Sequence, residues 1–384
     1  MNITIVGGGF GGVKTALELA KQPHNNITLI SDKADFQYYP ALYGTATGGS
    51  HLQSWVPLGE IFADKNNVEI HIDTITAVDP DKKTVTGGSG KVYAYRELVL
   101  ALGTVTTYFG IEGLDSYAYG IKSAEEIKKL KRHLSTEMGE HRLMDKDYVI
   151  VGAGPTGVEL AAALGLYLER LRVHYKLPRR KVNIHLIEAA PRVLPRMSKA
   201  LSRKVEKRLR KLGVKVQTSK KVESETADIL MVSGKPIKSS TVIWTSGVAN
   251  HPFYAANKSH FVFAQNGKIV VDEYMRVSKY VYVIGDNAAT PFSGLAQTAL
   301  HDAFFITHNF ARQSKGRQLK KYTVVSPPVV VPVGESWAAF EWHSVQLSGR
   351  LASVIRRLSD MIGYSDILPL GQALGVWSAG KVKE

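Results

Sequence analysis

The sequence contains no cysteine. This absence excludes structural disulfides, thiolate metal sites and every redox mechanism that relays electrons through a thiol. The sequence also has no apolar run of the roughly 20 residues that a membrane-spanning helix requires. A strand is expected at the very start, which leaves no room for a signal peptide. We therefore expect a cytoplasmic protein that is soluble or lies on a membrane surface, without a metal site.

Basic residues are in large excess. The 384-residue chain has a formal net charge of +15, and 44% of its residues are hydrophobic, enough for a core in two or three domains. Such a charge favours anionic partners, namely phospholipid surfaces, nucleic acids or phosphate-bearing cofactors. Much of it falls in residues 192–221, where Leu201, Val205, Leu209 and Leu212 recur at helical spacing. This stretch is typical of an amphipathic helix with a solvated basic face.

Two glycine-rich turns organise the chain. MNITIVGGGFGG at residues 1–12 and YVIVGAGPTG at residues 148–157 each place a β-branched run before Gly-x-Gly-x-x-Gly and an apolar helix. In such a turn the first glycine makes the tight turn, the second lets backbone approach a pyrophosphate, and the third lets helix pack on strand. The helix N-terminus then attracts the phosphates. Two copies predict an α/β protein that holds two dinucleotides, as a flavin enzyme reduced by a nicotinamide must.

The ends of the predicted second strands indicate how the two riboses are held. An acidic residue there normally binds the ribose hydroxyls of the adenosine. The first unit has Ser31 at this position and Asp32 next, so the contact is expected at one of the two. The second unit has Glu188, which suits a free 2′-hydroxyl and repels a 2′-phosphate, so NADH is favoured over NADPH. Arg192 is close enough in sequence to weaken that preference.

Three further buried strands end in small residues where cofactors bind. Residues 95–104 and 241–247 both end in a small-residue turn that lets the chain pass a cofactor. Residues 280–286 end in Gly-Asp, which places Asp286 at the carboxyl edge of the sheet. An unpaired buried carboxylate would be costly, so a hydrogen bond to the flavin ribityl chain is expected there.

Glu159 is the one early charge on the otherwise apolar second helix. Thr156 and Glu159 have the spacing of a Thr-x-x-Glu capping box, which by itself explains the carboxylate. The alternative is that Glu159 faces the nicotinamide near the flavin, and the two roles are compatible.

Two later helices carry the remaining candidates. In residues 294–310, Gln297 and His301 are four residues apart and share a face, where His301 is either a packing residue or a site residue. Residues 347–364 are predicted to form an amphipathic helix, with Leu347, Leu351, Val354, Ile355, Leu358, Met361 and Ile362 on one stripe and Arg350, Arg356 and Arg357 elsewhere. It is either an interfacial membrane helix with a cationic rim or a packing or dimer helix.

Taken together, these motifs resemble type II NADH dehydrogenases, the single-subunit NADH:quinone oxidoreductases. The resemblance rests on IVGGGFGG, YRELVLALGTVTTYFGIEGL, VIVGAGPTGVELAAAL, IEAAPRVLP, TVIWTSGV, VYVIGDNAAT and AQTALH, in the family's order and spacing. It implies an FAD domain at residues 1–112 and 256–325, interrupted by an NADH domain at 113–255. Residues 326–384 would then form a C-terminal amphipathic helical segment for membrane association or dimerisation. The implied partners are NADH, quinone, the inner face of the cell membrane and a second copy of the chain.

The resemblance also assigns residues. Glu159 is the family's carboxylate near nicotinamide and flavin, and Gln297 matches the first glutamine of the family's Ala-Gln-x-x-x-Gln quinone motif. His301 stands in place of the second glutamine, where a histidine is able to supply a proton near neutral pH. The residues expected to hold FAD are Gly7, Gly9, Phe10, Gly12, Ser31, Asp32, Ala101, Gly103, Thr104, Gly285 and Asp286. Those expected to hold NADH are Gly152, Gly154, Pro155, Thr156, Gly157, Glu188 and Gly247.

Two other functions remain as alternatives. One is a soluble NADH oxidase or reductase that uses oxygen or a small redox protein. The other is a redox-sensing flavoprotein whose basic surface binds nucleic acid, a partner that we do not expect here. The stretch ITLISDKADFQYYP is also similar to sulfide:quinone oxidoreductases, but their chemistry needs active-site cysteines, which this sequence lacks.

Overall fold

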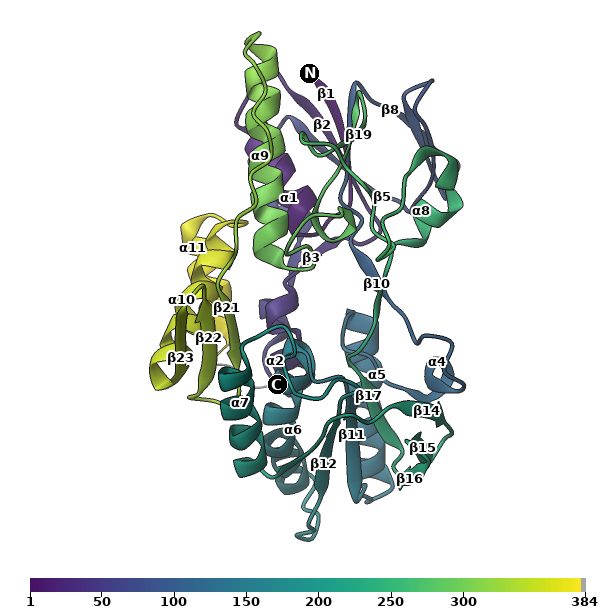
Figure 1. Ribbon diagram of the computed structural model, residues 1–384, viewed down its shortest axis with the longest axis vertical. Helices are drawn as coiled ribbons and strands as arrows, with labels where there is room; N and C mark the ends of the chain where they lie inside the picture. The colour runs from purple at the N-terminus through teal and green to yellow at the C-terminus, as the bar shows by residue number, and fades with distance from the viewer. Residues whose placement is uncertain (381–384) are drawn as a thin grey trace.

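The computed structural model describes residues 1–380 of an α/β protein with two main sheets and a smaller C-terminal unit. Figure 1 shows the first unit above, the second below, and the C-terminal unit beside the junction between them. Within the described residues, no helix is long and apolar enough to cross a membrane.

The first unit contains a six-stranded sheet in the order β19-β20-β9-β1-β2-β5. Its strands are β1 (Asn2–Val6), β2 (Asn26–Ser31), β5 (Val68–Ile72), β9 (Glu97–Leu100), β19 (Arg276–Ser278) and β20 (Val281–Val283). β1 runs parallel to β2 and β9, and the residues from Ile3 to Val6 are all buried. Such continuous burial is expected of a central parallel strand that is covered on both faces.

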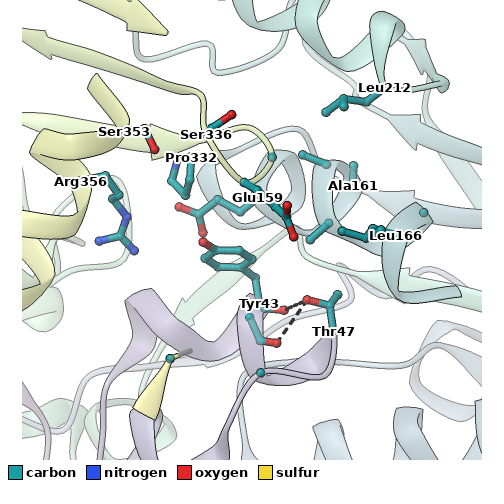
Figure 2. Close-up of a pocket in the computed structure, with 18 of the residues that line it drawn as sticks. Tyr43, Thr47, Glu159, Ala161, Leu166, Leu212, Pro332, Ser336, Ser353 and Arg356 are labelled. Carbon is teal, nitrogen blue, oxygen red and sulfur yellow. Dashed lines mark hydrogen bonds between the residues drawn. The ribbon is translucent and has the colours of Figure 1, made fainter. Parts of the chain in front are cut away.

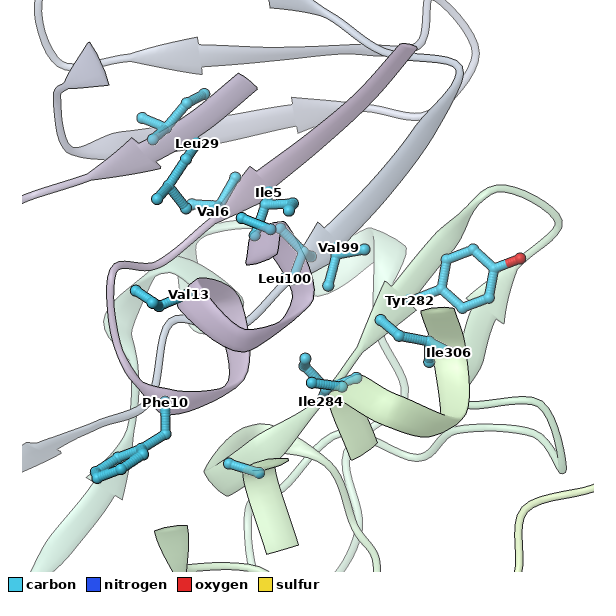
Figure 3. Packing of buried hydrophobic residues seen from close by; sticks show 14 of the residues in the cluster. Ile5, Val6, Phe10, Val13, Leu29, Val99, Leu100, Tyr282, Ile284 and Ile306 are labelled. Atoms are coloured by element: carbon cyan, nitrogen blue, oxygen red, sulfur yellow. The ribbon is translucent and has the colours of Figure 1, made fainter. Parts of the chain in front are cut away.

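Two helices cover one face of this sheet. α1 (Phe10–Ala20) connects β1 to β2, and α9 (Ala296–Ser314) packs alongside α1. Figure 3 shows the resulting core, in which Val13 of α1 and Ile306 of α9 approach Ile5, Leu100 and Ile284. Residues from both ends of the chain therefore build one hydrophobic core.

The second unit is inserted between these two parts of the first. Its four strands are all parallel, in the order β13-β12-β11-β17. The sheet and its helices comprise α5 (Ala124–Ser135), β11 (Asp147–Val151), α6 (Pro155–His174), β12 (Asn183–Ile187), α7 (Lys199–Lys211), β13 (Val214–Gln217) and β17 (Thr241–Trp244). The prediction of two Rossmann-like units, the second inserted in the first, is confirmed.

The basic helix predicted in residues 192–221 is present as α7. Leu201, Val205 and Leu209 are buried against the second sheet, as the spacing predicts. Leu212 lies one residue beyond the end of the helix and is 37% exposed, so it does not belong to the buried stripe.

Two chain crossings join the units. β10 (Thr104–Thr106) pairs antiparallel with β18 (Val248–Asn250), so the outgoing and returning segments lie side by side. The buried Asn287 fixes them: its Oδ1 accepts a hydrogen bond from the Gly103 N–H at 2.7 Å, and its Nδ2 donates to the Gly103 carbonyl and to Asn250 Oδ1.

Small sheets and short helices complete the two units. The strands are β3 (Asp35–Gln37), β4 (Trp55–Pro57), β6 (Ile75–Asp79), β7 (Thr84–Gly87), β8 (Val92–Ala94), β14 (Val222–Glu225), β15 (Ile229–Val232) and β16 (Lys235–Lys238). The short helices are η1 (Tyr39–Ala41), α2 (Leu42–Ala46), η2 (His51–Gln53), α3 (Leu58–Ile61), α4 (Leu114–Tyr117), η3 (Thr136–Glu140), α8 (Pro252–Ala256), η4 (Lys258–His260) and η5 (Gly285–Asn287).

The C-terminal unit contains the predicted helices, but an unpredicted sheet precedes them. A three-stranded antiparallel sheet comes first, formed by β21 (Val329–Pro332), β22 (Ala338–Trp342) and β23 (Val345–Gly349). α10 (Arg350–Ser365) and α11 (Leu370–Ala379) follow it. Leu347 therefore belongs to a strand and not to the helix, because Gly349 at φ +105° breaks the chain direction before α10 begins. Residues 381–384 of the predicted segment lie outside the described residues.

Candidate active site

The first glycine-rich turn lies between β1 and α1. Gly7 has φ +119°, and a Cβ atom there would lie 2.2 Å from the Ala101 carbonyl oxygen. A Cβ at Gly12 would lie 1.9 Å from the Gly7 carbonyl oxygen. The protein's own packing therefore requires these two glycines. A Cβ at Gly9 would meet no atom within 4 Å, so the space in front of the helix N-terminus is open.

The second turn, between β11 and α6, repeats this arrangement. Gly152 has φ +104°, and a Cβ there would lie 2.2 Å from Ser246 Oγ. A Cβ at Gly157 would lie 1.8 Å from the Gly152 carbonyl oxygen, whereas one at Gly154 would meet nothing within 4 Å. Pro155 occupies the first position of α6, where its missing N–H costs no hydrogen bond.

The middle glycine of each turn, Gly9 or Gly154, shows whether the turn leaves room for a dinucleotide. No protein contact explains why Gly9 and Gly154 lack a side chain, and both have ordinary extended backbone angles at a helix N-cap. A pyrophosphate that approaches the backbone at these points does explain it. The residues present therefore fit two dinucleotides, one at each turn.

The strand ends beside the first turn carry the polar groups expected there. Thr104 Oγ1 donates to Asp286 Oδ2 at 3.4 Å. Burial raises the pKa of Asp286, and the charges of Lys268 and Lys122 oppose that shift. The Gly285 N–H donates to Asp302 Oδ2 at 2.9 Å, so its backbone is fixed.

Lys122 is a further residue near Asp286, and nothing in the sequence indicates it. Its Nζ is buried, has no hydrogen-bond partner among the described residues, and lies within electrostatic range of Asp286. Burial lowers its pKa. An unpartnered buried ammonium beside the predicted ribityl contact suits the polar edge of a bound flavin.

The other residues predicted for FAD lie around the same turn. Ser31 is buried at the end of β2, where its Oγ would lie 2.4 Å from a Cβ on Gly8, and Asp32 is exposed next to it. The Phe10 ring packs edge-on against Phe36 with centroids 5.0 Å apart, so only the backbone of Phe10 faces the open N-terminus.

Glu188 reaches the second turn directly. Its Oε2 accepts a hydrogen bond from the Ala153 N–H at 2.6 Å, and its Oε1 accepts one from the Ala190 N–H at 2.8 Å. The carboxylate therefore stands at the glycine turn. The Arg192 guanidinium donates to the carbonyls of Pro195 and Met197 and is held away from this carboxylate by those bonds. Packing also requires glycine at position 247, because a Cβ there would lie 2.6 Å from the Thr107 carbonyl oxygen.

The predicted capping box at Thr156 and Glu159 is wrong. α6 begins one residue after Gly154, which is its N-cap, and no side chain caps it. Thr156 is therefore already inside the first turn, and the Glu159 carboxylate makes no capping bond. The capping box occurs instead on α5, between Ser123 and Glu126. Glu159 is thus left for another role.

Glu159 lines a cavity of about 900 Å³ between the second unit, α2 and the C-terminal unit. Figure 2 shows Glu159 and Tyr43 near its centre, Leu166 on the α6 side, and Pro332 and Arg356 on the C-terminal side. The cavity therefore has walls from three parts of the chain that are far apart in sequence.

A buried ion pair supports the C-terminal wall. The Arg356 guanidinium donates to Asp360 Oδ1, one helical turn away on α10, and to the Pro40 carbonyl at 2.9 Å. The Tyr38 hydroxyl donates to the same Asp360 oxygen at 3.2 Å. Arg356 Nε is buried without a partner among the described residues. One of the two alternatives for this helix placed Arg356 in a cationic rim, but its side chain points inward, as expected of a packing residue.

The charges in this cavity affect one another. Burial raises the pKa of Glu159 to about 8, with the Arg356 charge opposing the shift and the Asp360 charge adding to it. Glu159 therefore carries a proton at neutral pH. Burial by itself would lower the pKa of Arg356, but the charges of Asp360 and Glu159 raise it. Burial also raises the pKa of Tyr43.

Gln297 and His301 are not among the residues that line this cavity. Gln297 is exposed in the first turn of α9. The His301 Nε2 is 2.9 Å from the Thr323 carbonyl oxygen, and the ring lies beside Tyr322. His301 lines a second, smaller groove, so the structure does not bring it together with Glu159.

Sequence reasoning missed Tyr43, Arg356 and Asp360 as residues around Glu159. Tyr43 lies on the short helix α2, where no motif or periodicity in the sequence marks it. Arg356 and Asp360 have the i,i+4 spacing of an ordinary exposed helical ion pair. Both residues lie on the helix face away from the apolar stripe, so the spacing alone does not mark them as site residues.

Comparison with known proteins agrees with this geometry. Residues 1–303 match the family model described as pyridine nucleotide-disulphide oxidoreductase. The chain is 27% identical over 414 residues to the type II NADH:quinone oxidoreductase NdhA of Mycobacterium tuberculosis, covering 99% of this chain and 88% of that protein.

Two solved structures establish the fold. NDH2 of Plasmodium falciparum, in complex with NADH, matches with a TM-score of 0.88 at 18% identity, covering 99% of this chain and 97% of that one. The sulfide:quinone oxidoreductase of Aquifex aeolicus matches with a TM-score of 0.78 at 22% identity, covering 93% and 89%.

The two open glycines give a paired prediction. Gly9→Ala leaves the fold intact, because the added methyl meets no protein atom, but it weakens FAD binding at least tenfold because the methyl blocks the pyrophosphate. Gly154→Ala is the matched control: it retains FAD and raises the Kd for NADH instead. Flavin content and NADH titration measure the two effects, and a Gly9→Ala protein with full FAD content contradicts the assignment.

The buried ion pair gives a stability prediction. Arg356→Met removes the ion-pair partner of Asp360, which is mostly buried and keeps only the hydrogen bond from Tyr38, so the free energy of unfolding falls by about 2 kcal/mol. Arg356→Met together with Asp360→Asn recovers much of that loss. Arg210→Met removes an exposed i,i+4 pair on α7 and changes stability by less than about 1 kcal/mol. Urea unfolding measures all four proteins, and equal losses for Arg356→Met and Arg210→Met would contradict the buried pair.

Proposed function

The chain belongs to the pyridine nucleotide-disulphide oxidoreductase family, and from this premise we propose that it is an FAD-dependent NADH:quinone oxidoreductase. The observation that carries the proposal is the pair of matching glycine turns, each with an open middle glycine. Two such turns on one chain suit a flavin and the nicotinamide that reduces it.

The missing cysteines narrow the choice within this family. With no thiol in the chain, electrons have no route through a redox-active disulfide. Disulfide reduction and sulfide oxidation by active-site cysteines are thereby excluded. The acceptor must then react at the flavin itself, and the NADH:quinone activity named for the Mycobacterium tuberculosis relative is of that kind.

The proposed reaction balances with one proton from solvent. NADH loses a hydride, which is two electrons and one proton, and the quinone takes two electrons and two protons to become a quinol. Bound FAD supplies the chemistry that accepts the hydride and returns the electrons. Gly152, Gly154 and Glu188 bind NADH, and the carboxylate of Glu188 favours a free ribose hydroxyl over a phosphate.

We assign the acceptor to the cavity that Glu159 lines. Its walls combine apolar side chains such as Leu166 and Pro332 with Glu159, Tyr43 and Arg356, which suits an apolar ring with polar oxygens. Glu159 carries a proton at neutral pH and is placed to deliver it. The sequence suggested His301 as the proton donor. We assign that role to Glu159 instead, because the His301 ring is hydrogen-bonded to the Thr323 carbonyl and lies outside the cavity. Gln297 is exposed at the start of α9 and does not line this cavity, so the acceptor-side role predicted for it is not carried into this proposal.

The domain assignment follows from these sites. We propose that residues 1–112 and 256–325 bind FAD, that residues 113–255 bind NADH, and that residues 326–384 associate with the membrane. The support for the last is the outer face of α10, where Leu351, Val354, Leu358 and Ile362 recur at helical spacing and are each more than half exposed. Leu370 and Leu374 of α11 extend this face, and Arg350 and Arg357 are exposed at its borders. This amphipathic surface suits the inner face of the cell membrane.

Steady-state kinetics test the function. The purified, FAD-loaded protein should oxidise NADH in air at least tenfold faster when a short-chain quinone is added. Equal rates with and without quinone would identify an NADH oxidase and contradict the proposal. A tenfold preference for NADPH over NADH would contradict the role of Glu188.

Glu159 gives a pH-dependent prediction. Its raised pKa means that the carboxyl is protonated below about pH 8, so wild-type quinone reduction falls as the pH rises through 8. Glu159→Gln removes the proton and lowers turnover about a hundredfold at pH 7, without that pH dependence. Because folding favours the protonated carboxyl, Glu159→Gln also gains stability relative to wild type as the pH rises from 4.5 to 8. Unchanged turnover and NADH affinity in Glu159→Gln would show that the carboxyl has no catalytic role.

A further inference from the structure

A basic groove of about 460 Å³ lies along the outer side of α9, away from the cavity that Glu159 lines. Its floor includes Phe304 and Phe305 of α9. Five cationic side chains surround it: Arg312, Lys315, Arg317, Lys320 and Lys321. No acidic residue is among the described residues that line it, and no described carboxylate pairs with Lys315, Arg317 or Lys320.

The chain that carries these cations is held firmly against α9. After α9 ends, residues 315–323 return along the helix. The buried Asn309 side chain donates to the Lys320 carbonyl and accepts from the Lys320 N–H, both at 2.9 Å. The Tyr322 hydroxyl donates to the fully buried Asp302 at 2.6 Å. The positive charges are therefore displayed on a fixed backbone, which reduces the entropy lost when they bind an anion.

Phe304 of the groove is linked through Lys14 to the C-terminal end of α10. Lys14 Nζ lies 4.5 Å from the Phe304 ring centroid and donates to the carbonyl of Asp366, the residue that ends α10. Val324 and Val325, which follow the basic segment, are exposed. Figure 1 shows α10 and α11 at the end of α9 where this segment descends to β21. The basic segment is therefore followed directly by exposed apolar side chains and runs toward the C-terminal unit (Figure 1).

We propose that this groove binds the phosphate groups of anionic phospholipid headgroups. The inference rests on the membrane association proposed above and adds a lipid preference to it. Cations beside exposed apolar residues match the boundary between headgroups and acyl chains. Lys and Arg side chains strengthen membrane binding most where the membrane carries anionic lipid. Because salt screens charges over a Debye length of about 8 Å, only cations close to the membrane surface contribute.

Vesicle sedimentation tests the proposal on the FAD-loaded protein. The wild-type protein should bind phosphatidylglycerol vesicles more tightly than phosphatidylcholine vesicles. Arg317→Gln/Lys320→Gln should bind the anionic vesicles about 25-fold more weakly, since each basic residue at such a surface contributes roughly fivefold. Lys235→Gln/Lys238→Gln is the control, because it removes the same charge from the exposed strand β16 on the other side of the molecule and should bind like wild type. NADH oxidation with a water-soluble quinone should be equal in all three proteins.

The outcomes separate this inference from the proposed membrane association. If the wild type binds neither kind of vesicle, both are overturned. If it binds but the groove variant matches the β16 variant, or if both lipids bind alike, the groove inference alone is overturned. If the protein binds inorganic phosphate in solution more tightly than it binds phosphatidylglycerol vesicles, the groove is a site for free phosphate and the lipid assignment fails. Tighter binding of a DNA duplex than of anionic vesicles would overturn it as well.

Discussion

The contact of a helix with the carbonyl of its own glycine turn is the constraint on which both nucleotide sites depend. A Cβ on Gly12 or Gly157 would lie less than 2 Å from the carbonyl oxygen of Gly7 or Gly152. Only glycine permits α1 and α6 to start that close to their strands. This closeness aims each helix N-terminus at the open space beside Gly9 or Gly154, where its partial positive charge favours a phosphate. Because this turn occurs twice in the chain, the protein has a site for each of two dinucleotides.

The C-terminal unit closes the cavity to which we assign the acceptor. α10 brings Arg356 and Asp360 onto Tyr38 and Pro40, more than 300 residues earlier in the chain. The ion pair is costly to desolvate, and the hydrogen bonds from Tyr38 and to Pro40 offset part of that cost. The charges of Arg356 and Asp360 shift the pKa of Glu159 in opposite directions, and burial raises that pKa to about 8, so the carboxyl is protonated at neutral pH. The outer face of the same helix exposes leucines. A single helix therefore forms one wall of the cavity and presents an apolar surface outside.

The parts of the fold that follow local stereochemistry were predictable from the sequence. The glycine turns, the buried parallel strands and the amphipathic helix at α7 each need particular residues at particular spacings. The apparent capping box at Thr156 and Glu159 misled because Gly154 and Pro155 start the helix two residues earlier than that motif requires. The antiparallel sheet before α10 was missed for lack of a strong alternating pattern. Arg356 and His301 depend on long-range docking, on residues 38–40 and on the returning segment 315–323, which helical spacing does not encode.

The central claim is that one chain passes electrons from NADH to a quinone without a thiol relay. The most direct measurement is anaerobic stopped-flow absorbance of the flavin in the purified FAD-loaded protein, first with NADH alone and then with a short-chain quinone. The account predicts that NADH bleaches the flavin and that the quinone restores its absorbance at a rate no slower than steady-state turnover. Flavin that NADH does not bleach, or that quinone does not reoxidise, would contradict it.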